Sequence, residues 1–317
     1  MRRPLEFGAS FLADFMVKGT FLDLGTWRLG RRGRTEKNIE REIFVSAPPP
    51  IDDLVAAIVM AAGRGSRMSA ESGNKTLLPL MPEASDPAQR RPLLMEILDS
   101  LPPGPRALVV HHCKQDVMAA TDHLPLTYIE QPVLNGTGGA ILAAADFIRQ
   151  TACRRWIITM GDVPFVRPQT YHRLVAALAF SDMVVLGFRP VDKKQYGVLE
   201  TDGETVRRIT EWKYWKDYPV ERRAALTICN AGIYAVRREV LRAHLPTLAA
   251  TPQVVHKRMD GQMRAIEEYF ITDLVAAMVE AGRRVAYLIT EDESETMGVD
   301  DPQALAAARA LYRRRNP

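Results

Sequence analysis

The sequence predicts an α/β fold: a doubly wound, mainly parallel, Rossmann-like sheet that carries a small β-hairpin lobe. Two observations support this fold class. From residue 54 onward, short apolar runs of strand length alternate with segments that have the spacing of helices, as in proteins built from βαβ units. The first apolar run breaks into a glycine-rich loop, and doubly wound sheets bind their ligands at strand ends of this kind.

The predicted elements follow one another closely along the chain. The first strand begins at Leu54, and its Val, Ile and Ala content is typical of a strand buried on both faces. Further strands are predicted at residues 107–111, 126–129, 156–160 and 183–188. Helices are predicted between them at residues 93–101, 138–148 and 170–179.

After residue 188 the pattern changes to that of a hairpin. Residues 197–212 read GVLETDGETVRRITEW, in which Asp202-Gly203 is a strong turn signal between two strands. Two further helices are predicted at residues 271–281 and 302–314. The second begins well, with Asp301 as N-cap and proline in its first position.

The composition is that of a globular protein. With 317 residues, 47% of them hydrophobic, the chain can bury a substantial core in one large domain or two small ones. The net charge is only +4 and the aromatics are not interleaved with basic residues, which argues against a nucleic-acid partner. No apolar stretch is long enough to span a bilayer. The three widely spaced cysteines are expected to be core thiols in a reducing cytoplasm.

Residues 1–50 are predicted to form a basic N-terminal extension of a domain that spans residues 51–317. The segment is rich in arginine and ends in three prolines, which favour a stiff spacer. We expect a poorly ordered extension or a start codon assigned too early, with an arm for a partner or a membrane surface as the alternative.

The loop after the first strand has the outline of a phosphate-binding site. Gly63 and Gly65 allow the backbone to approach a ligand closely, and Arg67 and Lys75 supply positive charge. The loop lacks the Gly-Lys-Ser/Thr of the P-loop and the third glycine of the dinucleotide fingerprint, which excludes both motifs. Because similar loops also close ordinary strand-to-helix turns, the rest of the chain must decide.

Three later segments occur in the order found in one family. They read YIEQPVLNGTGGA at residues 128–140, IITMGDVPF at 157–165, and EEYFITD at 267–273 followed by MGVDD at 297–301. With the glycine loop and Lys75, they make the chain from residue 54 onward resemble the sugar-1-phosphate nucleotidyltransferases, most closely the uridylyltransferase domain of bacterial N-acetylglucosamine-1-phosphate uridylyltransferases. The resemblance implies a nucleotidyltransferase/glycosyltransferase-like sheet with the hairpin as a sugar-binding lobe. Since the sequence has no hexapeptide repeats, we do not expect the acetyltransferase half that accompanies this domain in many bacteria.

The resemblance implies a reaction in which a sugar 1-phosphate attacks the α-phosphorus of a nucleoside triphosphate and pyrophosphate leaves. UTP and N-acetylglucosamine 1-phosphate, or a related hexose phosphate, are the favoured substrates. Arg67 and Lys75 would be the catalytic cations, because the protein has to position and neutralise two polyanions. Asp162 and Asp300 would hold Mg²⁺, since carboxylate oxygens suit that ion. The alternative is that Asp162 closes a turn and Asp300 assists the cap at Asp301.

The resemblance also implies contacts with the two substrates. The residues implied for the nucleotide are Ala62, Gly63, Gly65, Gln131, Gly136 and Thr137. Those implied for the sugar are Gly197, Glu211, Asn230 and Thr272.

Some positions depart from the family pattern. Asn74, Leu134, Met160, Phe270 and Asp300 stand where the family commonly has Pro, Gln, Tyr, Tyr and Asn, respectively. Losing polar contacts weakens the case for uracil in particular.

Three other interpretations stay open. A molybdenum-cofactor nucleotidyltransferase shares the glycine loop and the Gly-Asp turn but attaches its nucleotide to a pterin phosphate. The departures fit a non-catalytic, nucleotide-sugar-sensing regulatory subunit, and a nucleic-acid adaptor would rest on residues 1–50 alone. The sequence does not determine the base, the sugar or the oligomeric state.

Overall fold

The computed structural model describes residues 53–63, 65, 68, 73–86, 90–259 and 262–316. The predicted N-terminal extension, residues 1–50, lies outside the described residues, and so does Arg67. The two predictions that concern them stay predictions.

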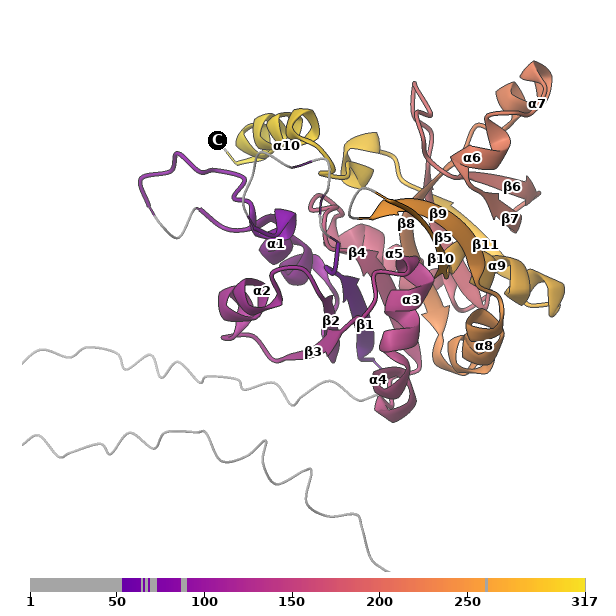
Figure 1. Cartoon of the computed structure of the whole chain (residues 1–317), viewed down its shortest axis with the longest axis horizontal. Coiled ribbons are helices and arrows are strands. Elements are labelled where there is room, and N and C mark those ends of the chain that lie inside the picture. The colour runs from indigo at the N-terminus through magenta and orange to yellow at the C-terminus, as the bar shows by residue number, and fades with distance from the viewer. Residues whose placement is uncertain are drawn as a thin grey trace, which may run out of the picture. The chain divides into compact units, whose positions relative to one another are not determined.

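A nine-stranded sheet forms the centre of the fold (Figure 1). Its strand order is β3-β2-β1-β4-β8-β5-β11-β7-β6. In that order the strands are Leu126–Glu130, Arg106–Val110, Val55–Met60, Arg155–Met160, Cys229–Arg237, Met183–Phe188, Val285–Ile289, Thr205–Thr210 and Val198–Asp202.

The prediction of a mainly parallel sheet is wrong, because the sheet is mixed. The strands β3, β2, β1 and β4 are parallel to one another, and β5 is parallel to β11. The strand β8 runs antiparallel to both of its neighbours, β4 and β5. Residues 189–228, which connect β5 to β8, include the hairpin, and β8 then enters the sheet between β4 and β5.

The predicted hairpin is present, and it is part of the same sheet. The strands β6 and β7 are antiparallel neighbours, and β7 also pairs with β11, where Thr205 is opposite Ala286. The strand β6 also pairs with β8 through Val198 and Cys229. The strands β8, β5, β11, β7 and β6 therefore form a closed ring.

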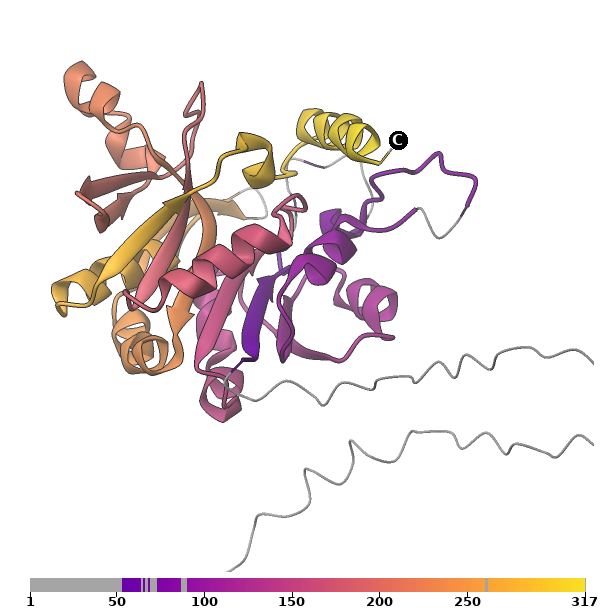
Figure 2. The ribbon, with the colours of Figure 1, turned by 180° about the vertical axis from the view of Figure 1, so that it is seen from behind.

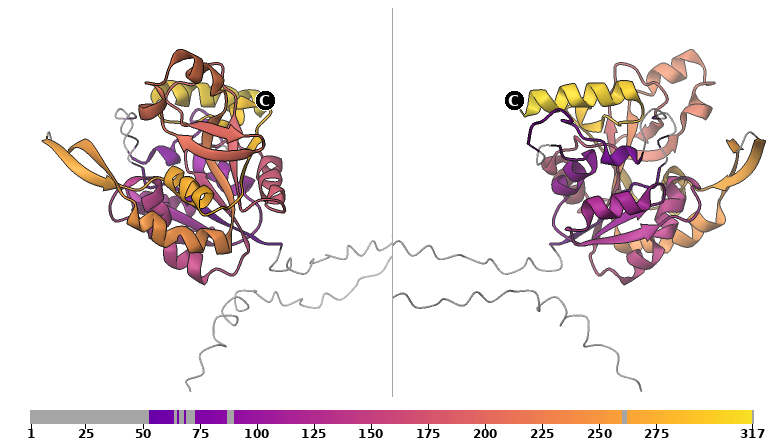
Figure 3. Two further views of the ribbon diagram at one scale, coloured as in Figure 1. Left: turned by 90° about the vertical axis from the view of Figure 1, so that its right-hand side faces the viewer. Right: turned by 60° about the vertical axis from the view of Figure 1, so that its left-hand side comes forward.

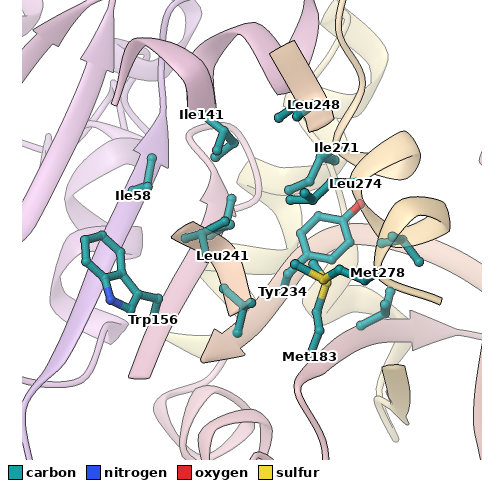
Figure 4. Close-up of a cluster of buried hydrophobic side chains, with 14 of the residues drawn as sticks. Ile58, Ile141, Trp156, Met183, Tyr234, Leu241, Leu248, Ile271, Leu274 and Met278 are labelled. Atoms are coloured by element: carbon teal, nitrogen blue, oxygen red, sulfur yellow. The ribbon is translucent and has the colours of Figure 1, made fainter. Parts of the chain in front are cut away.

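Helices cover both faces of the sheet, as a doubly wound fold requires. Side chains of β1 alternate between two cores: Ala56 and Ile58 enter one, and Ala57 and Val59 enter the other. Figure 4 shows the first core, in which Ile58 and Trp156 of the sheet share a cluster with helical leucines and isoleucines. The helices of this face are α3 (Gly136–Ala143), α4 (Ala145–Gln150), α8 (Arg238–Ala250) and α9 (Ile271–Glu280); those of the other are α1 (Leu93–Ser100), α2 (Lys114–Thr121) and α5 (Pro168–Ala177).

The remaining elements lie outside these two layers. The strands β9 (Gln253–Met259) and β10 (Gln262–Glu268) form a separate antiparallel ribbon, which projects from the rest of the fold in the left view of Figure 3. The C-terminal helix α10 (Pro302–Arg315) lies beside α1 in Figure 2 and packs against Leu93. The short elements are the 3-10 helices η2 (Lys75–Leu77) and η4 (Glu293–Thr296) and the helices α6 (Trp212–Trp215) and α7 (Val220–Ala225).

Most predicted elements are confirmed to within two residues, and β5 has the predicted bounds. Asp301 caps α10 as predicted, accepting a 2.8 Å hydrogen bond from the amide of Ala304. The helix predicted at 138–148 is in fact two helices, α3 and α4, which meet at Ala144. Cys153 and Cys229 are buried free thiols, but Cys113 is only half-buried, so the core prediction is wrong for it. Among the described residues no helix is long and apolar enough to cross a membrane.

The fold predicts where substitutions destabilise the protein. Ile58→Ala removes a fully buried side chain from the sheet, so we expect the free energy of unfolding to fall by about 2–5 kcal/mol. Val254→Ala changes a side chain that is 65% exposed, so it should alter the free energy of unfolding by less than about 0.5 kcal/mol. Urea titration followed by circular dichroism measures both values. Equal midpoints for the two variants would contradict the assignment of Ile58 to the core.

Candidate active site

Three charged side chains from distant parts of the chain meet at the carboxyl ends of the parallel strands β1 and β4. Asp162 follows β4, Asp300 directly precedes the cap of α10, and Lys75 begins η2. The Lys75 ammonium donates to the Asp162 carboxylate and, at 2.8 Å, to Oδ1 of Asp300. Lys75 and Asp162 are almost buried, with side chains 10% and 11% exposed, whereas Asp300 is 54% exposed. Lys75, one of the two predicted catalytic cations, and both predicted metal ligands therefore form one cluster.

Backbone hydrogen bonds hold the two carboxylate segments together. The amide of Val299 donates to the carbonyl of Asp162 at 2.8 Å, and the amide of Gly161 donates to the carbonyl of Met60 at 2.9 Å. A Cβ atom on Gly161 would lie 2.8 Å from that same carbonyl oxygen, so the turn requires glycine.

The charges in this cluster affect one another strongly. Burial lowers the pKa of Lys75, but the Asp162 and Asp300 carboxylates more than offset this and raise it above its ordinary value. Burial raises the pKa of Asp162, and the Lys75 ammonium opposes that effect. Two carboxylates and one ammonium leave one negative charge, which a bound cation would compensate.

The chemistry of the donor set fits Mg²⁺. No group of three or more His, Cys, Asp or Glu side chains with metal-ligand geometry occurs among the described residues. Mg²⁺ does not need such a group, because it is usually held by one or two carboxylates together with waters and substrate phosphates. Asp162 and Asp300 are the residues that would hold it.

The glycine loop packs against Lys75. Ala62 is buried and Gly63 is exposed at the end of β1. Gly65 has a φ of +59°, and a Cβ atom there would come within 3.2 Å of the Lys75 side chain. Gly65 thus lies directly beside the side chain of the predicted catalytic lysine.

Asn74 holds Lys75 in place. From the sequence this residue was recognised only as a departure from the family pattern. Its Nδ2 donates to the carbonyls of Ala61 and His112, at 3.2 and 2.9 Å. Its Oδ1 accepts from the amide and the hydroxyl of Thr76, at 3.0 and 2.9 Å. An Asn that bonds two residues ahead is a recognised capping pattern, and this pattern was the available signal.

The residues predicted to recognise the base form a braced turn at the start of α3. Nε2 of Gln131 donates to Oδ1 of Asn135 and to the carbonyl of Gly136, both at 3.0 Å. Gly136 has a φ of +90°, and a Cβ atom there would lie 2.4 Å from the Tyr269 carbonyl oxygen. Thr137 accepts a 3.2 Å hydrogen bond from the amide of Ile271. This turn therefore packs against the EEYFITD segment, and Asn135 is the member that the sequence did not predict.

The four residues predicted to contact the sugar also lie together. The amide of Asn230 donates to the carbonyl of Gly197 at 2.8 Å. A Cβ atom on Gly197 would lie 3.5 Å from Oε2 of Glu211. Burial raises the pKa of Glu211, and the nearby Thr272 hydroxyl lowers it in part. Gly197, Glu211, Asn230 and Thr272 thus come from four separate elements to one place.

Two departures from the family pattern lie beside these groups. Gly232 has a φ of +73°, and a Cβ atom there would lie 3.2 Å from Cγ of Met160. The ring of Phe270 lies 5.1 Å from the Lys213 ammonium. Burial raises the pKa of Tyr196, and the negative charges of Asp300 and Asp162 raise it further.

The raised pKa of Glu211 predicts a pH-dependent effect on stability. A carboxyl whose pKa is higher in the folded than in the unfolded protein adds stability at low pH and loses it as the pH rises through the folded pKa. Glu211→Gln should therefore raise the thermal midpoint at pH 8 and leave it nearly unchanged at pH 4. Differential scanning fluorimetry at both values measures this, with Glu221→Gln on the exposed surface of α7 as control. A lower midpoint for Glu211→Gln at pH 8 would contradict it.

Known proteins share sequence and fold with this chain. Residues 57–315 match the family described as MobA-like NTP transferase domain. The chain is 32% identical over 266 residues to the bifunctional protein GlmU of Cereibacter sphaeroides (strain ATCC 17025 / ATH 2.4.3), covering 82% of this chain and 53% of that protein. It is 31% identical to the bifunctional protein GlmU of Syntrophotalea carbinolica, covering 83% and 52%. The chain thus spans about half the length of these curated relatives.

A solved structure shows the same fold at low identity. The uridine diphosphate N-acetylglucosamine pyrophosphorylase from Trypanosoma brucei superposes with a TM-score of 0.63 at 11% identity, covering 81% of this chain and 65% of that one. The predicted resemblance to sugar-1-phosphate nucleotidyltransferases is confirmed. Because the family match covers most of the sequence, the chain belongs to the MobA-like NTP transferase domain family and is a nucleotidyltransferase.

Proposed function

We propose that the chain is a Mg²⁺-dependent sugar-1-phosphate nucleotidyltransferase that makes a nucleotide sugar and releases pyrophosphate. The observation that carries this proposal is the cluster of Lys75, Asp162 and Asp300. UTP is the favoured nucleotide, and N-acetylglucosamine 1-phosphate or a related hexose phosphate is the favoured acceptor. The three free cysteines suit a reducing cytoplasm, which we propose as its location.

The reaction needs positioning and charge compensation more than proton transfer. An anionic oxygen of the sugar 1-phosphate forms a bond to the α-phosphorus, and the bond from that phosphorus to the pyrophosphate oxygen breaks. Because the nucleophile is already an anion, no general base is required. A bound Mg²⁺ would neutralise phosphate charge and lower the barrier to displacement.

Lys75 is the described residue best suited to stabilise the leaving pyrophosphate. Its raised pKa keeps the ammonium protonated at neutral pH. Asn74 caps η2 and is itself hydrogen-bonded to the carbonyls of Ala61 and His112. These bonds fix the backbone from which the Lys75 side chain extends. An ordered cation costs little reorganisation during the reaction, which is the condition for electrostatic catalysis. Arg67 is proposed as a second cation on the sequence resemblance alone.

The binding residues divide between the two substrates. Ala62, Gly63 and Gly65 of the loop, with Gln131, Gly136 and Thr137, are proposed to bind the nucleotide. Support comes from Gln131, whose amide nitrogen is engaged within the turn and whose carbonyl oxygen accepts no hydrogen bond from the described residues. Gly197, Glu211, Asn230 and Thr272 are proposed to bind the sugar.

Substrate identity rests on the names of the relatives. They include a uridine diphosphate N-acetylglucosamine pyrophosphorylase and bifunctional proteins of which this chain spans about half. The family description also keeps a molybdenum-cofactor nucleotidyltransferase in view. The grouping of the four sugar residues favours the sugar phosphate over a pterin phosphate.

Pyrophosphate release tests the proposal directly. Each nucleoside triphosphate is paired with several sugar 1-phosphates in the presence of Mg²⁺, and we expect turnover to be highest with UTP and N-acetylglucosamine 1-phosphate. Turnover with a molybdopterin phosphate alone would establish the alternative enzyme. Binding of nucleotide sugars with no turnover for any pair would favour the sensing subunit.

Two matched substitutions test the carboxylates. Asp162→Asn should lower kcat at least about 100-fold, because it removes a buried charge that acts in the transition state. Asp300→Asn introduces the amide common in the family, and we expect it to change kcat less than about tenfold. Equal losses of kcat for the two variants would contradict the expectation that Asp162 contributes more to catalysis than the charge of Asp300.

A further inference from the structure

We propose that the C-terminal helix α10 is a brace that sets the arrangement of Lys75, Asp162 and Asp300, with Arg315 as its positioning residue. The inference deepens the proposed function and rests on it for its catalytic consequence. Its structural part, that α10 joins the three segments which carry these side chains, can be tested without activity.

The beginning of α10 fixes the Asp300 segment. Asp301 caps the helix through the amide of Ala304 and, with its own carbonyl, accepts from the amide of Leu305 at 3.0 Å. Asp300 is the residue immediately before this cap. Because Val299 is fully buried and its amide donates to the Asp162 carbonyl, the helix start is also tied to the second carboxylate segment.

The middle of α10 fixes the Lys75 segment. Nε of Arg309 donates to the carbonyl of Pro79 at 3.1 Å, four residues after Lys75. Leu80 lies in the same buried cluster as Leu305, Ala308 and Leu311 of the helix. One face of α10 therefore packs on the chain that leads away from η2.

The end of α10 fixes the Asp162 segment. Arg315 donates to the Phe165 carbonyl at 3.5 Å, and its guanidinium lies 5.2 Å from the Phe165 ring. The same guanidinium donates to Asp292 at 3.0 Å and to the Ser294 hydroxyl at 2.8 Å. Arg315 thus joins the turn after Asp162 to the turn that leads to Asp300.

A buried carboxylate adds a second link between the same two turns. Glu295 accepts from the Thr170 hydroxyl at 2.6 Å and from the Arg167 amide at 3.2 Å. The Arg167 guanidinium in turn donates to Asp292 at 2.5 Å. Asp292 therefore accepts from two arginines, and removal of Arg315 leaves its carboxylate with Arg167 as the remaining arginine partner.

The number of partners requires an arginine. One planar guanidinium supplies the hydrogen bonds to Asp292, Ser294 and Phe165 and also the ring contact. A lysine ammonium cannot reach these partners with the same fork geometry. Arg314, the preceding residue, is exposed and has no hydrogen bond or ion pair with any residue that the structure describes.

The experiment compares Arg315→Ala with Arg314→Ala, in the full chain and well below both thermal midpoints. Hydrogen exchange should become faster at residues 162–167 and 292–300 in Arg315→Ala only. In the same variant kcat/KM should fall about 10- to 100-fold, and the Mg²⁺ concentration for half-maximal rate should rise, as when a partner of a metal ligand is lost. Arg315→Lys should recover part of both effects.

The outcomes separate the two proposals. If the wild type is inactive with every substrate pair, the proposed function fails, while hydrogen exchange still decides whether α10 is a brace. If the two alanine variants exchange alike in both segments, the brace is refuted. If exchange differs but kcat/KM and Mg²⁺ dependence match the wild type, α10 only stabilises the fold, and the positioning role is refuted.

Discussion

Buried charge is the constraint on which this site depends. Lys75 and Asp162 have almost no contact with solvent, and each is tolerable only because the other lies beside it. The pair has to be assembled from residues 87 positions apart, with Asp300 a further 138 along the chain. Asn74, Gly161, Val299 and α10 all serve to bring these segments to one point.

The mixed sheet explains how the proposed nucleotide and sugar residues come from two halves of one sheet. The parallel strands β1 and β4 end at the glycine loop and the Gly-Asp turn. The strand β8 is antiparallel to β4 and carries Asn230. Residues from the ring of strands thereby lie next to residues from the parallel half. Met160 and Gly232 mark the border between the two halves, since a Cβ atom on Gly232 would lie 3.2 Å from Cγ of Met160.

Features encoded locally were predictable from the sequence, whereas those made by distant contacts were not. The strand Met183–Phe188 is buried at every position and appears in the sequence as an uninterrupted apolar run. The break between the helices α3 and α4 at Ala144 was not predictable, because no glycine or proline lies at that position. The direction of β8 is set by its pairing with β4 and β5, and the bonds of Asn74 depend on carbonyls that are distant in sequence. The β9–β10 ribbon was missed although its Asp-Gly pair at 260–261 is a turn signal.

The closed ring of strands limits how the β6–β7 hairpin can move. The hairpin is attached along one side through β7 to β11 and along the other through β6 to β8. A lobe held by a single edge can rotate about that edge as a hinge, but rotation here would break backbone hydrogen bonds on one side or the other. A sugar phosphate bound beside the hairpin, as proposed, would therefore be accommodated by loops and side chains rather than by closure of one domain onto another.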